Sequence, residues 1–282
     1  MLTSVFFISS ASIIIRYSDA PPLIIAFYRV FFAAVLLYIF APSSTNRHLR
    51  RIDRQTLLTC ALAGFFLALH FATWITSLSY TTIANSVVLV DSGPLIALFL
   101  SHFILKEKGS PTTFGAILIA MTGVVIISWG DFSTDSGHFT GDVLAVIGAF
   151  GTAAYLICGR VIRQRMPLTP FLVLVYGFAA LFLCIYCFIT RIDFFGYTPY
   201  NYLLFAALAV FPTIGGHSLI LYTLRYMKAY LANLAFLGEP VAAPVLAFLF
   251  FREAPSWFFY AGGILIILGS LAAIVHEGRR EK

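Results

Sequence analysis

Long apolar windows alternate with short polar breaks along almost the whole of this 282-residue chain. A helix of roughly 20 apolar residues is long enough to cross a bilayer core about 30 Å thick. The breaks between the windows are too short to hold a soluble domain. The pattern predicts ten membrane-spanning helices: Leu2–Tyr17, Pro22–Phe40, Leu57–Ser79, Ile83–Leu105, Thr112–Trp129, Asp142–Val161, Thr169–Ile189, Tyr202–Tyr222, Ala229–Phe251 and Trp257–Val275.

Composition agrees with this pattern. Of all residues, 60% are hydrophobic and 11% are charged, whereas soluble domains average about 45–50% and about 25%. A water-soluble fold is excluded, and an all-α integral membrane protein is predicted. The net charge of +6 comes without a basic stripe interleaved with aromatic residues, so no nucleic-acid partner is expected.

The basic residues predict the orientation, because short cytoplasmic loops are enriched in Lys and Arg. One set of alternate loops holds fourteen of them and the other set holds three, Arg16, Arg191 and Arg252. Both termini are therefore expected in the cytoplasm, in a multi-pass protein of the plasma membrane. The fourteen are Arg47, Arg50, Arg51, Arg54, Lys106, Lys108, Arg160, Arg163, Arg165, Arg225, Lys228, Arg279, Arg280 and Lys282.

This topology gives a first testable prediction. A single cysteine at Ser133 is expected to react with an impermeant thiol reagent in intact cells, and one at Asn46 is expected to stay unlabelled until the cells are opened. The reverse pattern would overturn the orientation, and labelling of both positions would contradict the number of spans.

The two halves of the sequence resemble each other, which indicates a diverged duplication. A shift of 146 or 148 positions aligns prolines, acids and glycines that rarely coincide by chance. An odd number of five spans per copy forces the second copy into the membrane upside down, so we expect a ligand site near the midplane and alternating access. The expected units are residues 1–129, residues 141–276 and a cytoplasmic tail, 277–282. Aligned pairs are Pro94 with Pro240, Glu107 with Glu253, Gly123 with Gly269, Pro22 with Pro170, Tyr28 with Tyr176, and Asp91 with Glu239.

The residues of these segments resemble a known family. Ala84-Asn85 through Pro94 to Glu107, with Gly115 to Gly123, and the partner segment from Leu237 to Gly269 are similar to the two EamA-type repeats of the drug/metabolite transporter superfamily. The resemblance covers nearly the whole chain. It implies ten helices in two inverted five-helix units, and export or exchange of small metabolites such as amino acids. Substrate identity does not carry over from it.

Three charged residues fall at membrane depth, where each costs roughly 2.5–3.5 kcal/mol on insertion scales. They are Arg29, Asp91 and Glu239. We predict that Arg29 and Asp91 form a structural ion pair, because they lie at matching depths. The two acids are candidates for binding a substrate amine or a proton. Since a nearby Arg29 would keep Asp91 ionised, Glu239 is the acid expected to provide any proton coupling.

Prolines and polar residues complete the expected site. Pro94, Pro240 and Pro244 each remove an intrahelical hydrogen bond, and breaks at corresponding places point to a binding region with a kinking or gating role. His70, Thr73, Trp74 and Ser77 share one helical face. The full set predicted to line the cavity is His70, Thr73, Trp74, Ser77, Asn85, Asp91, His217, Tyr222, Asn233 and Glu239.

The sequence favours a secondary transporter over other classes, with a small-molecule substrate and the lipid bilayer as partners. The four cysteines lie in apolar runs, and no metal-ligand spacing, cofactor motif or phosphate-binding loop is found. A membrane-embedded lipid-modifying enzyme and a channel-like facilitator remain as alternatives. An enzyme is disfavoured because the longest loops hold no cluster of acids or histidines.

Overall fold

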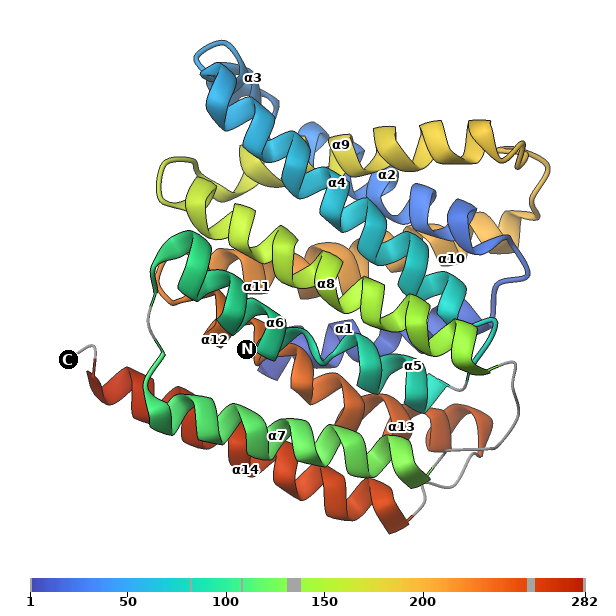
Figure 1. The fold of residues 1–282 in the computed structure, drawn as a ribbon. Coiled ribbons are helices and arrows are strands. Elements are labelled where there is room, and N and C mark those ends of the chain that lie inside the picture. Colours follow the sequence, from blue (N-terminus) through green and yellow to red (C-terminus); the bar gives the residue numbers. More distant parts are fainter. Residues whose placement is uncertain (1, 82, 108, 131–137, 253–256, 281–282) are drawn as a thin grey trace.

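A computed structural model of the chain describes residues 2–81, 83–107, 109–130, 138–252 and 257–280. Over these residues all regular secondary structure is helical, without a strand, and the helices pack side by side in one bundle (Figure 1). Apolar side chains cover much of the outside of this bundle, as expected of a surface that faces lipid.

The elements follow one another along the chain as short and long helices. They are α1 (Leu2–Arg16), α2 (Pro22–Phe40), α3 (Pro42–Leu49), α4 (Arg54–Ser77), α5 (Ile83–Val90), α6 (Gly93–Leu100), the π-helix η1 (Ser101–Leu105), α7 (Pro111–Gly130), α8 (His138–Arg163), α9 (Leu168–Ile189), α10 (Pro199–Leu208), the π-helix η2 (Ala209–His217), α11 (Ser218–Thr223), α12 (Ala229–Asn233), the 3-10 helix η3 (Phe236–Gly238), α13 (Glu239–Phe251) and α14 (Trp257–Arg280).

Seven helical stretches in the described part of the chain are long and apolar enough to cross a membrane. The predicted all-helical, integral membrane fold is therefore confirmed, whereas ten spans remain a prediction. Two other predicted spans are shorter apolar helices, Thr3–Arg16 and Pro111–Ile126, and the ninth is divided into α12, η3 and α13. The seven are Pro22–Phe40, Arg54–Ser77, Ser86–Leu105, Phe139–Arg163, Leu168–Ile189, Pro199–Thr223 and Tyr260–Glu277.

The start of α4 is fixed by a side-chain cap. Asp53 accepts hydrogen bonds from the hydroxyl of Thr56 at 2.6 Å and from its backbone N–H at 2.9 Å, which satisfies a donor that the first helical turn leaves free. The hydroxyl bond and then the backbone bond lower the pKa of the exposed Asp53 carboxyl. The cap follows α3, a short helix within the predicted loop from Ala41 to Thr56.

Glycines allow α8 to lie directly against α4. A Cβ added to Gly151 would lie 2.9 Å from the backbone nitrogen of His70 and 2.9 Å from the carbonyl oxygen of Phe66. Without that carbon, the two helix backbones approach closely at the level of His70. This contact places His70 in the interior of the bundle.

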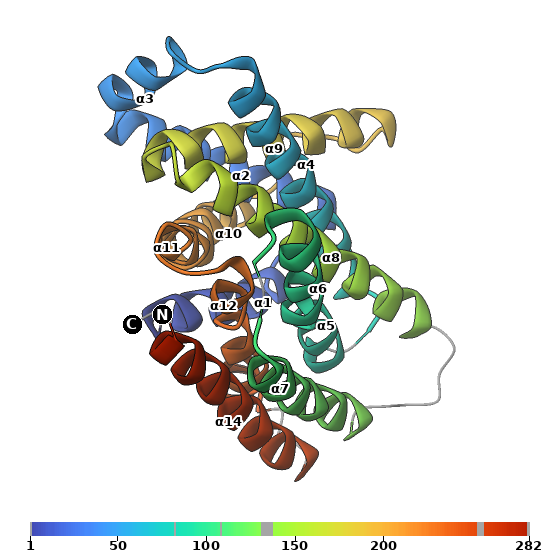
Figure 2. The same ribbon diagram turned by 60° about the vertical axis from the view of Figure 1, so that its left-hand side comes forward.

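The helices α7 and α14 pack against each other at one edge of the bundle, as Figures 1 and 2 show. Their glycines make reciprocal contacts. A Cβ on Gly123 would overlap the carbonyl oxygen of Gly262, and a Cβ on Gly269 would lie 2.5 Å from the carbonyl oxygen of Ala116. Gly269 is 146 positions after Gly123, and Gly262 is 146 positions after Ala116. The contact therefore maps onto itself when the chain is shifted by 146 positions.

The chain interrupts its helices at two corresponding places. The first break separates α5 from α6, and Pro94 lies in the first turn of α6. The second separates η3 from α13, and Pro240 lies in the first turn of α13. Proline is tolerated there because the first turn leaves its N–H positions unbonded. Both prolines therefore begin a new helical segment, where the sequence predicted a kink within a longer helix.

The two segments also end alike. Lys106 after η1 has a φ of 57° and Arg252 after α13 has a φ of 59°, a left-handed conformation that few residues other than glycine adopt. Arg252 is 146 positions after Lys106. The same backbone turn thus ends both segments.

Both termini lie at the same end of the bundle, which is also the end that carries α3 (Figures 1 and 2). Asn46 belongs to α3, whereas Ser133 lies outside the described residues. The helix α14 continues through Arg280, so the first residues of the expected tail extend the last helix.

Candidate functional site

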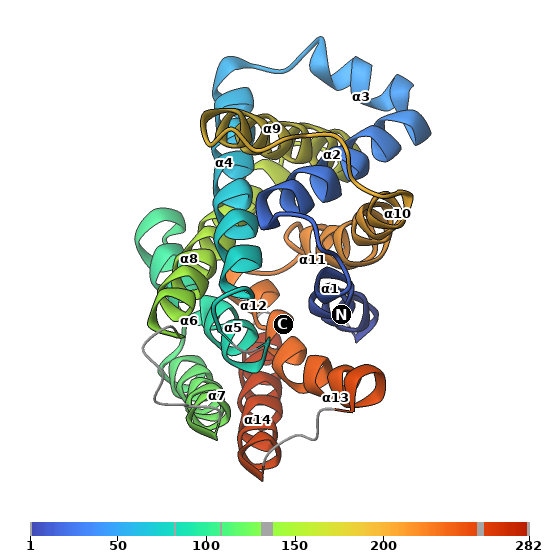
Figure 3. The same cartoon turned by 90° about the vertical axis from the view of Figure 1, so that its right-hand side faces the viewer.

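A small cavity lies in the interior of the bundle, with a free volume of about 10 Å³, roughly enough for one water molecule. Figure 3 shows α1, α5 and α13 beside one another in this part of the molecule. Its walls come from both halves of the chain. The lining residues are Ile8, Ala11, His70, Trp74, Val90, Asp91, Thr152, His217, Phe236 and Glu239.

Two histidines face each other in this cavity. The ring centroids of His70 and His217 are 6.0 Å apart, and the two residues are 147 positions apart in the sequence. His70 is fixed by neighbours: its Nδ1 lies 2.6 Å from the hydroxyl of Thr152 and 3.0 Å from the carbonyl oxygen of Gly148, and Trp74 stacks on its ring. His217 is buried, and its Nδ1 has no hydrogen-bond partner among the described residues.

Two acids line the same cavity. Asp91 follows the end of α5 and Glu239 begins α13, so each acid lies at one of the two helix breaks. Their exposed fractions are 4% and 3%. One carboxylate oxygen of each, Oδ2 of Asp91 and Oε1 of Glu239, is buried without a hydrogen-bond partner in the described structure. Buried polar atoms are normally bonded, so these oxygens are candidates for binding a ligand or a proton.

The predicted ion pair between Arg29 and Asp91 is not formed in this conformation. Nε of Arg29 donates to Oγ1 of Thr213 at 3.1 Å, and the guanidinium lies over the ring of Phe71, 3.9 Å from its centroid. Nη1 and Nη2 have no hydrogen-bond partner among the described residues. Matching depth did not bring the two residues together, because the direction of each side chain also depends on the rotation of its helix.

The other predicted residues divide into those near the cavity and those away from it. The buried amide of Asn233 lies against Gly93, at the break before α6. Thr73 bonds the carbonyl of Leu69, one turn earlier on α4. The hydroxyl of Ser77 lies 2.5 Å from that of Ser86, so neither Thr73 nor Ser77 lines the cavity.

Tyr222 is 48% exposed and packs beside Tyr226, away from the cavity. The neighbouring residue Ser218 differs from Tyr222: Ser218 is buried and lies 3.1 Å from the hydroxyl of Tyr176, whereas Tyr222 points outward. The side chains of Asn85 and Pro244 lie outside the described residues.

The sequence did not indicate several residues that line the cavity. Thr152 orients His70, and Phe236 packs beside His217 with centroids 5.3 Å apart. Phe236 is the first residue of η3, which ends at the break before Glu239. Its place next to this break was a signal that the sequence offered. Thr152 follows Gly151 and belongs to a helix of small residues, where nothing distinguishes it from a residue that only packs.

At the end of the bundle with the termini, ion pairs join loops and helices. Glu107 accepts from Nε of Arg160 at 2.9 Å and from the backbone N–H of Ala229 at 3.4 Å. Arg160 also donates from Nη1 to the carbonyl of Leu224 at 2.6 Å. We call Glu107, Arg160 and these two backbone groups the Glu107 cluster. It joins α8 to the segment between α11 and α12 and to the loop before α7.

A second cluster lies at the same end. Glu277 on α14 pairs with Lys228 and accepts a hydrogen bond from the hydroxyl of Thr113 at 2.7 Å. Lys228 caps α12 and Thr113 lies in α7. We call these three residues the Glu277 cluster. Together the two clusters join α7, α8, α12 and α14 at this end of the bundle.

A larger pocket of about 150 Å³ lies among the ends of α1 and α4 and the beginnings of α2 and α5. It shares α1 and α4 with the central cavity, through Ser12 and Ile75 in place of Ile8 and Trp74. These elements lie at the opposite end of the bundle from the termini (Figure 1). This pocket and the central cavity share no lining residue.

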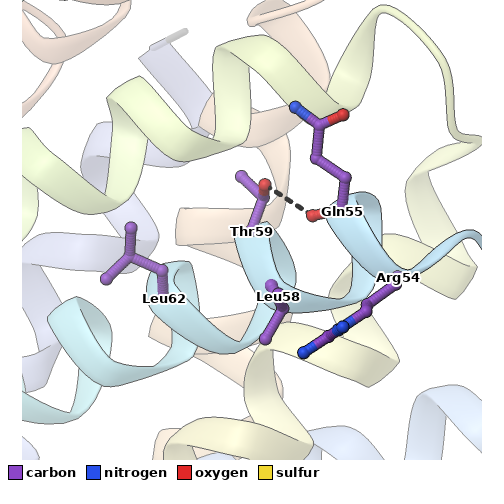
Figure 4. A pocket seen from close by; sticks show the side chains of 5 residues that line it. All are labelled: Arg54, Gln55, Leu58, Thr59 and Leu62. Atoms are coloured by element: carbon purple, nitrogen blue, oxygen red, sulfur yellow. Dashed lines mark hydrogen bonds between the residues drawn. The ribbon is translucent and has the colours of Figure 1, made fainter.

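Another pocket lies on the surface of the first turns of α4 (Figure 4). Its walls are Arg54, Gln55, Leu58, Thr59 and Leu62, all from one helix, and Thr59 is hydrogen-bonded to the backbone of Gln55. A binding site needs polar groups that converge from several directions. This surface pocket does not provide them, and the central cavity does.

The described part of the chain shows neither a metal-binding cluster nor a disulfide. No group of three His, Cys, Asp or Glu residues is placed there to hold a metal ion. Cys60, Cys158, Cys184 and Cys187 are free thiols. The chemistry of the cavity is therefore that of its carboxyl, imidazole and indole groups.

A bundle of membrane-spanning helices with broken segments and converging polar groups in its interior defines an integral membrane transport protein. The profile of the EamA-like transporter family matches residues 1–129 and 139–275. The chain belongs to this family, within the drug/metabolite transporter superfamily, as its sequence motifs indicated.

Relatives support this assignment. A transporter of Synechocystis sp. is 26% identical over 88% of this chain and 74% of its own length. The transporter YxxF of Bacillus subtilis is 21% identical over 98% of this chain and 89% of its own. A solved crystal structure of a protein superposes with a TM-score of 0.76 over 100% of this chain and 97% of its own, at 19% identity. That likeness concerns the fold alone. The family and the names of the relatives indicate a transporter rather than an enzyme.

Proposed function

We propose that this protein is a secondary transporter that exports or exchanges a small polar metabolite, an amino acid or a related compound, by alternating access through the central cavity. The observation that carries the proposal is the set of buried polar groups in that cavity: His70, His217, Asp91 and Glu239 meet there. Charged and polar residues at membrane depth are costly and mark substrate or ion pathways. In the conformation described the cavity has room for about one water molecule, so the helices around it must move apart before a metabolite can enter.

The architecture of the proposal is ten spans in two inverted five-helix repeats, residues 1–129 and 141–276. Three observations support it: the reciprocal contacts of Gly123 and Gly269, the helix breaks at Asp91 and Glu239, and the left-handed turns after both broken segments. Repeats of this kind place a ligand site where broken helices meet near the midplane. Asp91 and Glu239 hold equivalent places in the two breaks.

In the proposed cycle, one repeat rocks against the other. The Glu107 cluster and the Glu277 cluster join helices at the end that bears the termini, and the basic residues predict that this end faces the cytoplasm. In the proposed cycle these clusters hold the cytoplasmic side shut in one state. Release of these ion pairs, with closure of the pocket among α1, α2, α4 and α5, would give the opposite state.

The alternatives have weaker support. A channel-like facilitator needs a continuous water-filled path, whereas the central cavity has room for about one water molecule. A lipid-modifying enzyme needs reactive groups at a membrane face, whereas the convergent groups lie in the interior of the bundle. Proton coupling through the cavity acids belongs to the proposal and is treated in the Discussion.

Solute-loss profiling tests the proposed function. Cells that express the wild type are expected to lose a small set of polar metabolites to the medium, and the double variant His70→Ala, His217→Ala is expected to lose at least about tenfold less, since both rings line the cavity. The matched control is Tyr222→Phe, on an exposed side chain of the same region. Altered lipids without solute loss would favour the enzyme, and unchanged solutes and lipids would contradict the proposal.

A further inference from the structure

Arg29 is a fully buried cation in the interior of the bundle, and its guanidinium forms no ion pair among the described residues. Its side chain is 0% exposed. Nε is bonded to Thr213, whereas Nη1 and Nη2 have no hydrogen-bond partner among the described residues. A buried charge is normally paired, because an unpaired one costs several kcal/mol. The free Nη1 and Nη2 groups of Arg29 can therefore bind an anion.

The guanidinium is held in one orientation. The hydroxyl of Thr213 donates to the carbonyl oxygen of Leu208 at 2.8 Å, five residues earlier, so that its oxygen is free to accept from Nε of Arg29 at 3.1 Å. Leu208 directly precedes η2 and Thr213 lies in its middle, and π-helices are frequent at functional sites. Phe71 lies beneath the guanidinium plane at 3.9 Å. The edge formed by Nη1 and Nη2 is therefore the edge left for a ligand.

The surroundings add polar groups but no ion pair. Tyr176 on α9 directs its hydroxyl to Ser218 and to the carbonyl of Thr213. Asp91 and Glu239, the acids of the cavity, make no ion pair with Arg29 in the described structure. The positive charge therefore persists next to a cavity that is otherwise lined by acids and neutral rings.

Phe71 connects Arg29 to the cavity. Its ring contacts the guanidinium on one side and lies 5.3 Å from the ring of His217, a cavity residue, on the other. Arg29 is thus one side chain away from the cavity wall. A further donor in the wall, Nε1 of Trp74, is also buried without a partner among the described residues, as is the ring atom Nδ1 of His217. The free N–H groups of Arg29 and Trp74 point to a ligand that brings acceptors.

We propose that Arg29 is the specificity residue for a carboxylate on the transported solute, a step that rests on the proposed function. Nη1 and Nη2 present parallel N–H groups to the two oxygens of one carboxylate, the bidentate geometry that favours Arg over Lys. Widening of the cavity past His217 brings the carboxylate to Arg29. Asp91 and Glu239 then lie on the far side of the solute, where they repel a second negative charge.

The test compares free acids with their neutral derivatives on the full-length wild type in proteoliposomes. The solute is the one identified by solute-loss profiling, and the competitors are its free acid, its methyl ester and its amide at equal concentrations. The ester and the amide are expected to compete at least about tenfold more weakly than the acid, since they lack the anionic pair of oxygens. Equal competition by acid and ester would overturn the inference.

Variants give an independent reading. Arg29→Gln is expected to abolish the preference for the acid over the ester, and Arg29→Lys, which keeps the charge without the fork, to restore only part of it. The control is Arg54→Gln, an exposed arginine on α4. If Arg29→Gln does not fold, the acid and ester comparison on the wild type decides alone.

The outcomes separate this inference from the proposed function. If solutes are exported but none carries a carboxylate, the proposed role of Arg29 is contradicted and the proposed transport function is supported. An exported solute with a phosphate group and no carboxylate counts as this outcome. If no solute leaves the cells, the proposed function itself fails. A retained preference for the acid in a folded Arg29→Gln protein would also overturn the assignment.

Discussion

Gly123→Ala and Gly269→Ala are each expected to destabilise the protein strongly, by a few kcal/mol or enough to prevent recovery of folded material. A Cβ on Gly123 would overlap the carbonyl oxygen of Gly262 and lie 2.9 Å from the backbone nitrogen of Ile266. A Cβ on Gly269 would lie 2.5 Å from the carbonyl oxygen of Ala116. These neighbours are backbone atoms, so no side-chain rotation relieves the overlap, and overpacking typically costs about 1–3 kcal/mol or more.

The measurement is the thermal midpoint of the purified protein in detergent, together with the yield of monodisperse material. Gly115→Ala is the matched control, because it lies on the same helix as Gly123 and its added Cβ would meet nothing within 4 Å. Its midpoint is expected to stay within the experimental error or to rise slightly. If Gly123→Ala and Gly115→Ala melt alike, α7 and α14 do not cross as described.

The pair of glycines also tests the relation between the two halves. Because each glycine meets the residue equivalent to the other's neighbour, the two substitutions are expected to cause similar losses. A severe effect at one position and a mild effect at the other would show that the two sides of the α7 and α14 contact are not equivalent. Similar losses would support the proposed pseudo-twofold relation.

Much of this fold could be read from the sequence, because in a membrane protein the apolar windows themselves mark the helices. The windows and the helix ends agree closely for α2, α9 and the stretch from Ser86 to Leu105. The pairing of Pro94 with Pro240 also pointed to the two breaks. The pattern could not distinguish a bend within one helix from the start of a new helix, since both follow from the missing N–H of proline.

The site was predicted in part. His70 and His217 were both expected to line the cavity, and their rings do lie 6.0 Å apart. The pairing of Arg29 with Asp91 and the place of Tyr222 depended on helix rotation, where one residue changes the direction by about 100°. Hydrophobic windows that are apolar on all sides fix no rotation. Depth alone was therefore not a sufficient guide for these residues.

The structure also changes the expectation for proton coupling. Arg29 was expected to keep Asp91 ionised and leave Glu239 as the acid that titrates, but Arg29 does not pair with Asp91. Instead Asp91 and Glu239 line one cavity, each with an unbonded carboxylate oxygen. Two like charges in a dry site are costly, and interacting acids titrate as a pair. Both acids, and not Glu239 alone, are thus candidates for carrying the coupled proton.

Glu239→Gln is accordingly expected to make transport insensitive to an imposed pH gradient while solute exchange across proteoliposomes continues. The amide keeps the size of the side chain and cannot bind or release a proton. Gradient-driven accumulation should fall at least about tenfold, while exchange stays within about threefold of the wild type, since exchange requires only that the loaded site reorients. Asp91→Asn is expected to behave in the same way because its carboxyl faces the same cavity.

The control is Asp193→Asn, an exposed acid in the segment between α9 and α10, which should keep both activities. If Asp91→Asn retains full gradient dependence while Glu239→Gln loses it, Glu239 alone carries the proton and the pair does not act as a unit. If the wild type transports equally well with and without a gradient, neither acid couples protons. The two carboxyls are then left with a role in holding the solute or the helix breaks, and the solute's own gradient drives its movement.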